Sequence, residues 1–190
     1  MKIGFIDNFD SFVYNLVRYV RETTAGEVCI QRNNEINFNE LDSCDAILLS
    51  PGPGIPEEAG DLLKVIDRYH ATKPLFGVCL GHQALGVYFK NELVQCPFPI
   101  HGKSSTIITQ NESTLFKDLA KELQVGRYHS WQLKLDNSSE LKPTAFDLDG
   151  TLMAFEHATK PIHGVQFHPE SILTPDGRKM IANWMKQISS

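Results

Sequence analysis

The stretch FGVCLGHQ, residues 76–83, holds a cysteine between two glycines, where an apolar run gives way to a helix-like sequence. Residues 75–79 are typical of a short buried strand, and residues 84–89 favour a helix. A chain that passes from strand to helix here must turn sharply, and Gly77 and Gly81 remove side chains that would clash at the bend. The stretch therefore predicts an α/β fold in which Cys79 lies at a strand-to-helix turn.

Short apolar runs and helical patterns alternate on both sides of this stretch. Between the first two runs, Phe12, Leu16 and Val20 recur at helical spacing, and Asp10 or Ser11 is placed to cap the helix. Strands alternating with helices predict a mostly parallel sheet covered on both faces. The predicted strands are 2–7, 28–32, 46–50 and 75–79, and the further predicted helices are 62–69 and 84–89.

The second half of the chain has a different pattern, with strand-like runs and few helices between them. These runs predict antiparallel additions to the sheet, followed by a final amphipathic helix at residues 178–188. The absence of a linker, repeat or low-complexity segment favours one α/β domain over residues 1–190. The predicted strands here are 106–109, 132–135, 144–148, 152–156 and 162–167.

Composition excludes several classes of function. The 190 residues are 42% hydrophobic, which is enough for a sizeable core, and the net charge of -5 gives no basic field for nucleic acid. No apolar run is long enough to span a membrane, and the start MKIGFIDNFD lacks the features of a signal peptide. We therefore expect a soluble, cytoplasmic protein that binds neither nucleic acid nor membrane.

The four cysteines form no CxxC pair. In a cytoplasmic protein, such scattered cysteines indicate free thiols, and neither a disulfide framework nor a zinc site is expected. Two spaced pairs, Cys79 with His82 and His163 with His168, lack the second pair of thiolates that would complete a zinc site. The cysteines are Cys29, Cys44, Cys79 and Cys96.

Cys79 is the first candidate for chemistry. The bend exposes its sulfur at the carboxyl end of a strand, where open α/β sheets place their sites. The thiol also lies near a helix N-terminus, whose dipole favours the thiolate. The alternative is a buried structural cysteine, which is the commoner role for this residue type.

A cysteine nucleophile needs a base, and the stretch HGVQFHPES, residues 163–171, offers one. His168 ends an apolar strand and Glu170 follows two residues later, so the carboxylate can hold the imidazole in one tautomer. Taken singly, a structural histidine and a solvated glutamate are the simpler interpretations. Because Cys79 and the histidine–glutamate pair occur in the same chain, the catalytic interpretation of each supports that of the other.

The stretch LLSPGPGIP, residues 48–56, leads from a strand into a loop of alternating prolines and glycines. Gly52 and Gly54 leave backbone N–H groups uncovered by side chains. The loop can therefore supply one oxyanion donor, with the Leu80 amide as the other. An ordinary turn is the alternative, and a phosphate cradle is disfavoured because no GK[ST] follows.

The stretch FDLDGTLM, residues 146–153, matches the DxDGT motif of haloacid-dehalogenase-type phosphatases. That fold builds its sheet after the motif, and only about forty residues remain here. Asp149 and Gly150 between two strand-like runs instead predict a hairpin turn. Asp147 is then expected in a hairpin strand, outside any active site.

The PGPG loop, the GVCLGHQ bend and the late HPES closely resemble the class I glutamine amidotransferases, in that chain order. The resemblance extends from IDNFDSF near the start to the final helix. The stretches PGPGIPEEAG, HGKSS and RYHSW narrow it to the small subunits of anthranilate synthase or aminodeoxychorismate synthase.

The resemblance implies a role for each matching residue. Cys79 would be the nucleophile, His168 the base and acid, and Glu170 the orienting carboxylate. Position 131 is tryptophan, where the family usually has leucine. The residues implied in glutamine binding are Gly52, Pro53, Gly54, Gln83, Ser130 and Trp131.

The implied activity is hydrolysis of L-glutamine to glutamate and ammonia through a cysteine thioester, without a metal or organic cofactor. The ammonia would pass to a separate chorismate-utilising synthase subunit in a hetero-oligomer. The residues leave open whether the product is anthranilate or aminodeoxychorismate. Two further alternatives are a stand-alone cysteine hydrolase or peptidase of the same fold and a non-catalytic regulatory subunit.

Overall fold

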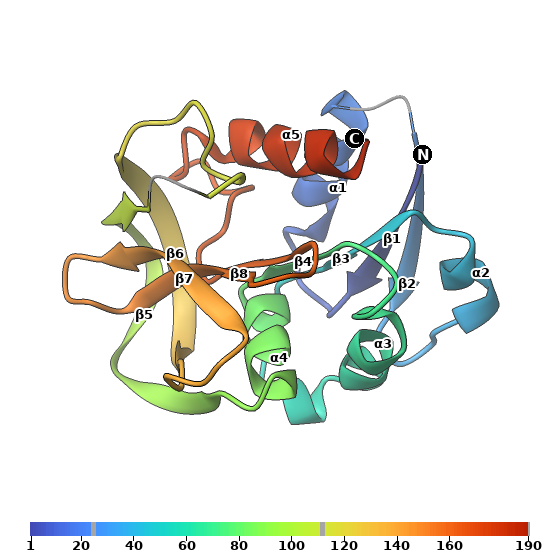
Figure 1. Cartoon of the computed structure of the whole chain (residues 1–190), viewed down its shortest axis with the longest axis horizontal. Coiled ribbons are helices and arrows are strands. Elements are labelled where there is room, and N and C mark those ends of the chain that lie inside the picture. Colours follow the sequence, from blue (N-terminus) through green and yellow to red (C-terminus); the bar gives the residue numbers. More distant parts are fainter. Residues whose placement is uncertain (24–25, 111–112, 190) are drawn as a thin grey trace.

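The fold is a twisted nine-stranded sheet with helices on both faces (Figure 1). This computed structural model describes residues 1–23, 26–110 and 113–189. Within these residues the strand order is β2-β1-β3-β4-β9-β8-β7-β5-β6. The α/β fold predicted from the sequence is confirmed.

The parallel half of the sheet consists of five short strands. Four of them come from the first half of the chain, and the fifth, β9, returns beside β4 from near its end. Their side chains are mostly buried, as expected for strands covered on both faces. The strands are β1 (Lys2–Asp7), β2 (Glu27–Arg32), β3 (Ala46–Leu49), β4 (Leu75–Val78) and β9 (Ile162–Val165).

The antiparallel half extends the sheet beyond β9. Its two longest strands, β5 and β6, pair with each other, and β6 is the last strand of the sheet. Four of the five predicted antiparallel additions are therefore confirmed. The fifth, residues 162–167, instead forms β9, which pairs parallel with β4 as well as antiparallel with β8, because the chain returns to the middle of the sheet there. The strands are β5 (Glu92–Thr109), β6 (Glu122–Lys134), β7 (Leu141–Asp147) and β8 (Leu152–His157).

Two groups of helices cover the sheet (Figure 1). Helices α1 (Val13–Thr23) and α5 (Gly177–Ile188) pack on one face, where Phe76 and Trp184 stack with ring centroids 5.3 Å apart. On the other face lie α2 (Phe38–Asp42), the short 3-10 helix η1 (Pro56–Glu58), α3 (Leu62–Tyr69) and α4 (Leu80–Tyr88). The two apolar clusters together form one layered core.

Some predicted boundaries are wrong for identifiable reasons. Strands β5 and β6 begin well before the predicted residues 106 and 132, because Pro97, Pro99 and a polar, exposed stretch hide the pattern of an edge hairpin. Helix α4 begins at Leu80 and not at residue 84. Gly81 lowers helix propensity there, but the helix is buried and packing decides its start.

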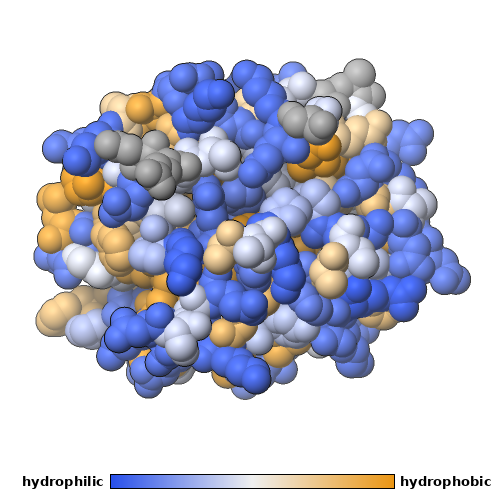
Figure 2. All heavy atoms as spheres, viewed as in Figure 1, coloured by the Kyte–Doolittle hydropathy of each residue, from blue (hydrophilic) through white to orange (hydrophobic). Residues whose placement is uncertain are grey.

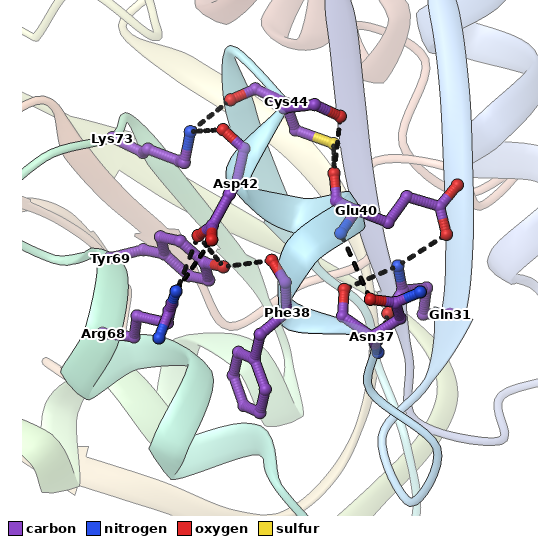
Figure 3. A network of polar contacts seen from close by, with 10 residues as sticks. Gln31, Asn37, Phe38, Glu40, Asp42, Cys44, Arg68, Tyr69 and Lys73 are labelled. Carbon is purple, nitrogen blue, oxygen red and sulfur yellow. Dashed lines mark hydrogen bonds and ion pairs between the residues drawn. The ribbon is translucent and has the colours of Figure 1, made fainter.

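Helix α2 was not predicted, and a polar network holds it in place (Figure 3). The Asn37 side chain accepts a hydrogen bond from the Glu40 N–H and so caps the helix. At the other end, the Asp42 carboxylate accepts hydrogen bonds from Arg68 and Tyr69 of α3. Such long-range contacts explain why five residues form a helix that propensity alone does not predict.

The DxDGT stretch forms the predicted hairpin turn between β7 and β8. The Asp147 Oδ1 accepts hydrogen bonds from the N–H groups of Asp149, at 3.0 Å, and Thr151, at 2.7 Å. Gly150 has φ +81°, a value that favours glycine. Asp147 ends β7, as expected for a hairpin strand.

The face of the molecule seen in Figure 2 is mostly hydrophilic, with hydrophobic residues in small separate areas. Among the helices of the described residues, none is long and apolar enough to cross a membrane.

Candidate active site

Cys79 lies at the predicted bend between β4 and α4. Its φ of 51° is uncommon for a residue with a side chain, and such strain often marks functional sites. A Cβ on Gly77 would lie 2.5 Å from the Gly81 backbone, and a Cβ on Gly81 would overlap the Leu49 carbonyl oxygen. Both glycines are therefore required for the close packing of β3, β4 and α4 around the bend.

The Cys79 side chain is less accessible than the sequence suggested. The residue is only 5% exposed. Its Sγ lies 3.9 Å from the Tyr128 carbonyl oxygen and 3.7 Å from the Gln166 Nε2. The expectation of an exposed sulfur is wrong because strand β6 and the segment after β9 pack over the bend.

His168 and Glu170 form a tight buried pair. The His168 Nδ1 lies 2.6 Å from the Glu170 Oε1, and their side chains are 4% and 1% exposed. The His168 N–H donates to the Gly126 carbonyl, and the Thr174 hydroxyl donates to the His168 carbonyl, so the backbone is fixed at this point. The strand β9 ends at Val165, two residues earlier than predicted.

The charge state of His168 depends on both acidic neighbours. Burial disfavours the imidazolium, but the nearby Cys79 and Glu170 outweigh it and raise the pKa of His168 well above its ordinary value. Among the described residues, the His168 Nε2 has no hydrogen-bond partner. The ring therefore has one nitrogen held by Glu170 and the other left for Cys79.

A pocket of about 210 Å³ borders Cys79. It brings together every residue that the sequence implied for glutamine binding. Leu80, which directly follows Cys79, is buried, and as the first residue of α4 it has an N–H without an acceptor inside the helix. The pocket is lined by Gly52, Pro53, Gly54, Cys79, Gln83, His101, Tyr128, His129, Ser130 and Trp131.

The PGPG loop is held against the first strand by a polar contact that sequence reasoning missed. The Asn8 N–H donates to the Ser50 hydroxyl at 2.9 Å, and its Nδ2 donates to the Ser50 carbonyl at 2.8 Å. A Cβ on Gly52 would lie 2.5 Å from the Asn8 carbonyl oxygen, so only glycine fits there. Gly54 has φ +77°. The only sequence feature that pointed to Asn8 was its place in the polar turn IDNFD after the first strand.

The far wall of the pocket is backbone from β6. The Gln83 Nε2 donates to the Trp131 carbonyl at 3.0 Å and to the Gln166 Oε1 at 3.2 Å. The β5–β6 ladder is interrupted here, since Gln95 pairs with Trp131 and Ile100 with His129, which leaves Ser130 outside the ladder. The backbone of Ser130 is thus available to a ligand.

A second pocket, of about 320 Å³, lies on the other side of Tyr128. His168 and Glu170 border it, together with the exposed side chains of Phe12 and Ile172. Tyr128 lines both pockets, and its ring meets the His168 ring edge-on, with centroids 4.9 Å apart. Sequence reasoning missed Tyr128, His101 and His129, because aromatic residues in a β-strand do not signal a site by their spacing.

In the part of the chain that the structure describes, no three histidine, cysteine or acidic side chains are grouped closely enough to hold a metal ion. The site is built from a thiol, an imidazole, a carboxylate and backbone amides.

These features define a cysteine–histidine–glutamate site on an α/β sheet, and the comparisons with known proteins agree with it. Residues 4–188 match the glutamine amidotransferase class-I family, and the chain belongs to this family. The resemblance drawn from the sequence is thereby confirmed.

Relatives of known name lie close in sequence. The chain is 45% identical to anthranilate synthase component 2 of Pseudomonas aeruginosa, a match that covers 96% of this chain and 94% of that protein. It is 41% identical to the aminodeoxychorismate/anthranilate synthase component 2 of Bacillus subtilis, over 95% and 94%. A solved structure of a putative GMP synthase subunit from Thermoplasma acidophilum superposes with a TM-score of 0.88 at 27% identity, covering 100% of this chain and 94% of that one.

Proposed function

We propose that this chain is the glutaminase subunit of a chorismate-utilising synthase, and that it hydrolyses L-glutamine to glutamate and ammonia. The observation that carries the proposal is the buried His168–Glu170 pair beside Cys79. Cys79 and Glu170 together raise the pKa of His168, and Cys79 lies at a strained bend that borders a pocket. The names of the relatives, component 2 of anthranilate and aminodeoxychorismate synthases, support the subunit role.

The first chemical step forms a thioester. The raised pKa of His168 favours transfer of the thiol proton to the imidazole, which leaves Cys79 as a thiolate. The sulfur attacks the side-chain amide carbon of glutamine, and the N–H groups of Leu80 and Gly54 stabilise the oxyanion. His168 then gives its proton to the leaving nitrogen, and ammonia departs.

The second step restores the enzyme. His168 takes a proton from water, the hydroxide attacks the thioester carbon, and glutamate leaves as the Cys79 sulfur is released. Glu170 accepts a hydrogen bond from the His168 Nδ1–H, so the lone pair of Nε2 points to the reacting atoms. The 1% exposure of the Glu170 side chain keeps this hydrogen bond away from competing water.

Glutamine is bound largely by backbone groups. Gly52, Pro53 and Gly54 form one wall of the pocket, and β6 at Ser130 and Trp131 forms the other. The Gln83 side chain holds the Trp131 carbonyl by a hydrogen bond. The backbone at position 131 is the same whichever side chain the residue carries, so tryptophan can replace the leucine usual in the family.

The partner subunit would bind beside the second pocket. Ile172 is 94% exposed and Phe12 is 43% exposed, and both border the pocket that contains His168 and Glu170. Apolar side chains exposed around a functional site favour a protein interface. A synthase subunit bound here would receive ammonia next to the residue that releases it.

The direct test is Cys79→Ala in complex with the synthase subunit. Glutamate release should fall to background, since the thiol forms the covalent bond, whereas product formation from added ammonium salt should persist. Cys29→Ala, which removes a buried thiol that does not line the pocket, is the matched control and should keep glutamine-dependent activity. Glutamine hydrolysis by the Cys79→Ala protein would refute the proposal.

A further inference from the structure

The DxDGT stretch contains a buried charge that the proposed chemistry does not use. The Asp147 Oδ2 lies 2.5 Å from the Arg127 Nη1, and the two side chains are 4% and 6% exposed. Removing one partner of a buried ion pair is strongly destabilising, so such a pair is a firm anchor for whatever else it holds. Asp147 lies at the end of β7, and Arg127 lies on β6, the strand that also borders the pocket.

Arg127, held by Asp147, in turn holds the His129 ring. The Arg127 Nε donates to the His129 Nε2 at 3.0 Å. Because a guanidinium can only donate, the His129 Nε2 must accept, and the ring proton must lie on Nδ1. Nδ1 therefore donates to the Trp131 carbonyl oxygen, 2.9 Å away. Burial and the charge of Arg127 lower the pKa of His129 to about 4, which keeps the ring neutral and this tautomer in place.

The Trp131 carbonyl thus receives two hydrogen bonds, one from His129 and one from Gln83. A carbonyl oxygen has two lone pairs, so the peptide is fully held and cannot rotate. This occurs where the β5–β6 ladder is interrupted and β6 is the last strand of the sheet. Two side chains thus hold the carbonyl of the residue that follows the gap in the ladder.

We propose that Asp147, Arg127 and His129 form a relay of positioning residues that fixes the Trp131 carbonyl and so sets the shape of the glutamine pocket. The inference rests on the proposed glutaminase activity. None of the three is a catalytic residue. His129 borders the pocket, and the relay acts on the pocket through the backbone of Ser130 and Trp131. Loss of the relay should weaken glutamine binding more than it slows the chemistry.

The first test is Asp147→Asn with Asp149→Asn as its matched control. The asparagine Oδ1 can still accept from Asp149 and Thr151, so the turn survives, but its amide nitrogen now faces the Arg127 donor. Asp149 is exposed and loses the same charge within the same motif. We expect the KM for glutamine to rise roughly tenfold in Asp147→Asn, with kcat within about threefold, and neither to change in Asp149→Asn.

The second test separates the donor from simple packing. His129→Leu removes the donor to Trp131, whereas His129→Asn keeps an amide near the position of Nδ1. We expect a KM increase of roughly tenfold for leucine and recovery of most of the affinity for asparagine. His157→Leu removes another buried histidine outside the pocket and should leave the KM unchanged.

A labelling experiment distinguishes failure of the relay from failure of the glutaminase assignment. A glutamine analogue that alkylates thiols, 6-diazo-5-oxonorleucine, should label Cys79 slowly in His129→Leu, while iodoacetamide should react at the wild-type rate. If the analogue fails to label the wild-type chain, the proposed function is wrong. If it labels wild type and variants equally fast, or if the KM values match and only kcat and thermal stability fall, the relay is purely structural and the inference is overturned.

Discussion

At the scale of single residues, the site depends on where protons are held. His168 has two acidic neighbours, and its raised pKa lets it keep a proton beside the Cys79 sulfur. His129, on β6 beside the pocket, is held neutral by burial and by Arg127. Both histidines are buried, but acidic neighbours keep the proton on His168, whereas the positive charge of Arg127 disfavours a second proton on His129.

Glu170→Gln should reduce activity less than His168→Ala. The amide removes charge and tautomer control but leaves the base in place, whereas alanine removes the base itself. We expect His168→Ala to lower the rate about 10²–10⁴-fold and Glu170→Gln to lower it by roughly a tenth of that factor. Single-turnover glutamate release from folded protein measures both. Equal losses would show that Glu170 has a more direct role in the chemistry.

The stability of the chain should fall as the pH drops below about 6.5, the ordinary pKa of histidine. Burial lowers the pKa of His129 to about 4 and that of His82 to about 3, so the unfolded chain binds more protons in this range. By linkage, His129 alone should cost about 3 kcal/mol between pH 7 and pH 4. His168 does not add to this loss of stability. Its pKa is raised in the folded state, so below about 6.5 it is protonated in both the folded and the unfolded chain.

Urea unfolding of wild type and His129→Asn between pH 7 and pH 4.5 measures this slope. The variant lacks one of the titrating groups, so its free energy of unfolding should depend less steeply on pH. Parallel slopes for the two proteins would contradict the assignment of a neutral, buried His129.

At the scale of elements, the bend between β4 and α4 is set by close packing. The N–H of Cys79 donates to the Val165 carbonyl, and its carbonyl accepts from the Gln83 N–H, so the strained residue is tied to both β9 and α4. Gly81 lies against the backbone of β3 with no room for a methyl group. The geometry of the thiol therefore depends on three strands and one helix together.

Gly81→Ala should destabilise the chain by at least about 3 kcal/mol, because the helix must move away from Leu49. Gly150→Ala is the matched control. Its Cβ would meet nothing within 4 Å, and the strain at φ +81° should cost only about 1 kcal/mol. Thermal and denaturant unfolding compare the two. Similar small losses would mean that the bend tolerates a side chain and is less tightly packed than described.

At the scale of the whole molecule, the chain has a pocket beside Cys79, which we propose binds glutamine, and an adjacent apolar surface, but uncontrolled hydrolysis would waste glutamine. Coupling to a synthase is therefore expected. A partner bound near Ile172 could order the PGPG loop so that the Gly54 N–H points into the oxyanion hole. One such donor is worth about 10²–10³ in rate, so a small backbone change would suffice.

The isolated chain should hydrolyse glutamine slowly, and the matching chorismate-utilising subunit should raise the rate substantially, more so with chorismate bound. Glutamate release from the chain alone, with the partner, and with the partner plus chorismate measures this. Ile172→Glu should weaken the activation by the partner, because it places a charge in the apolar interface. Equal rates in all three conditions would exclude loop ordering and favour a stand-alone hydrolase.

The sequence by itself determined the α/β fold, the bend at Cys79 and the hairpin at Gly150. These follow from local rules, since glycines mark tight turns and apolar periodicity marks strands and helices. The pairing of His168 with Glu170 was also predictable, because two residues of separation bring both side chains to one end of a strand.

Only the tertiary structure decided which distant polar residues meet. Asp147 was expected only as part of a hairpin strand, yet it forms an ion pair with Arg127, and Asn8 was expected only in a polar turn, yet it holds Ser50. Neither contact leaves a periodic signal, because hydrogen bonds between strands depend on the order of the sheet. The burial of Cys79 has the same origin, since β6 and the segment after β9 pack over a thiol that its own neighbours in sequence would leave exposed.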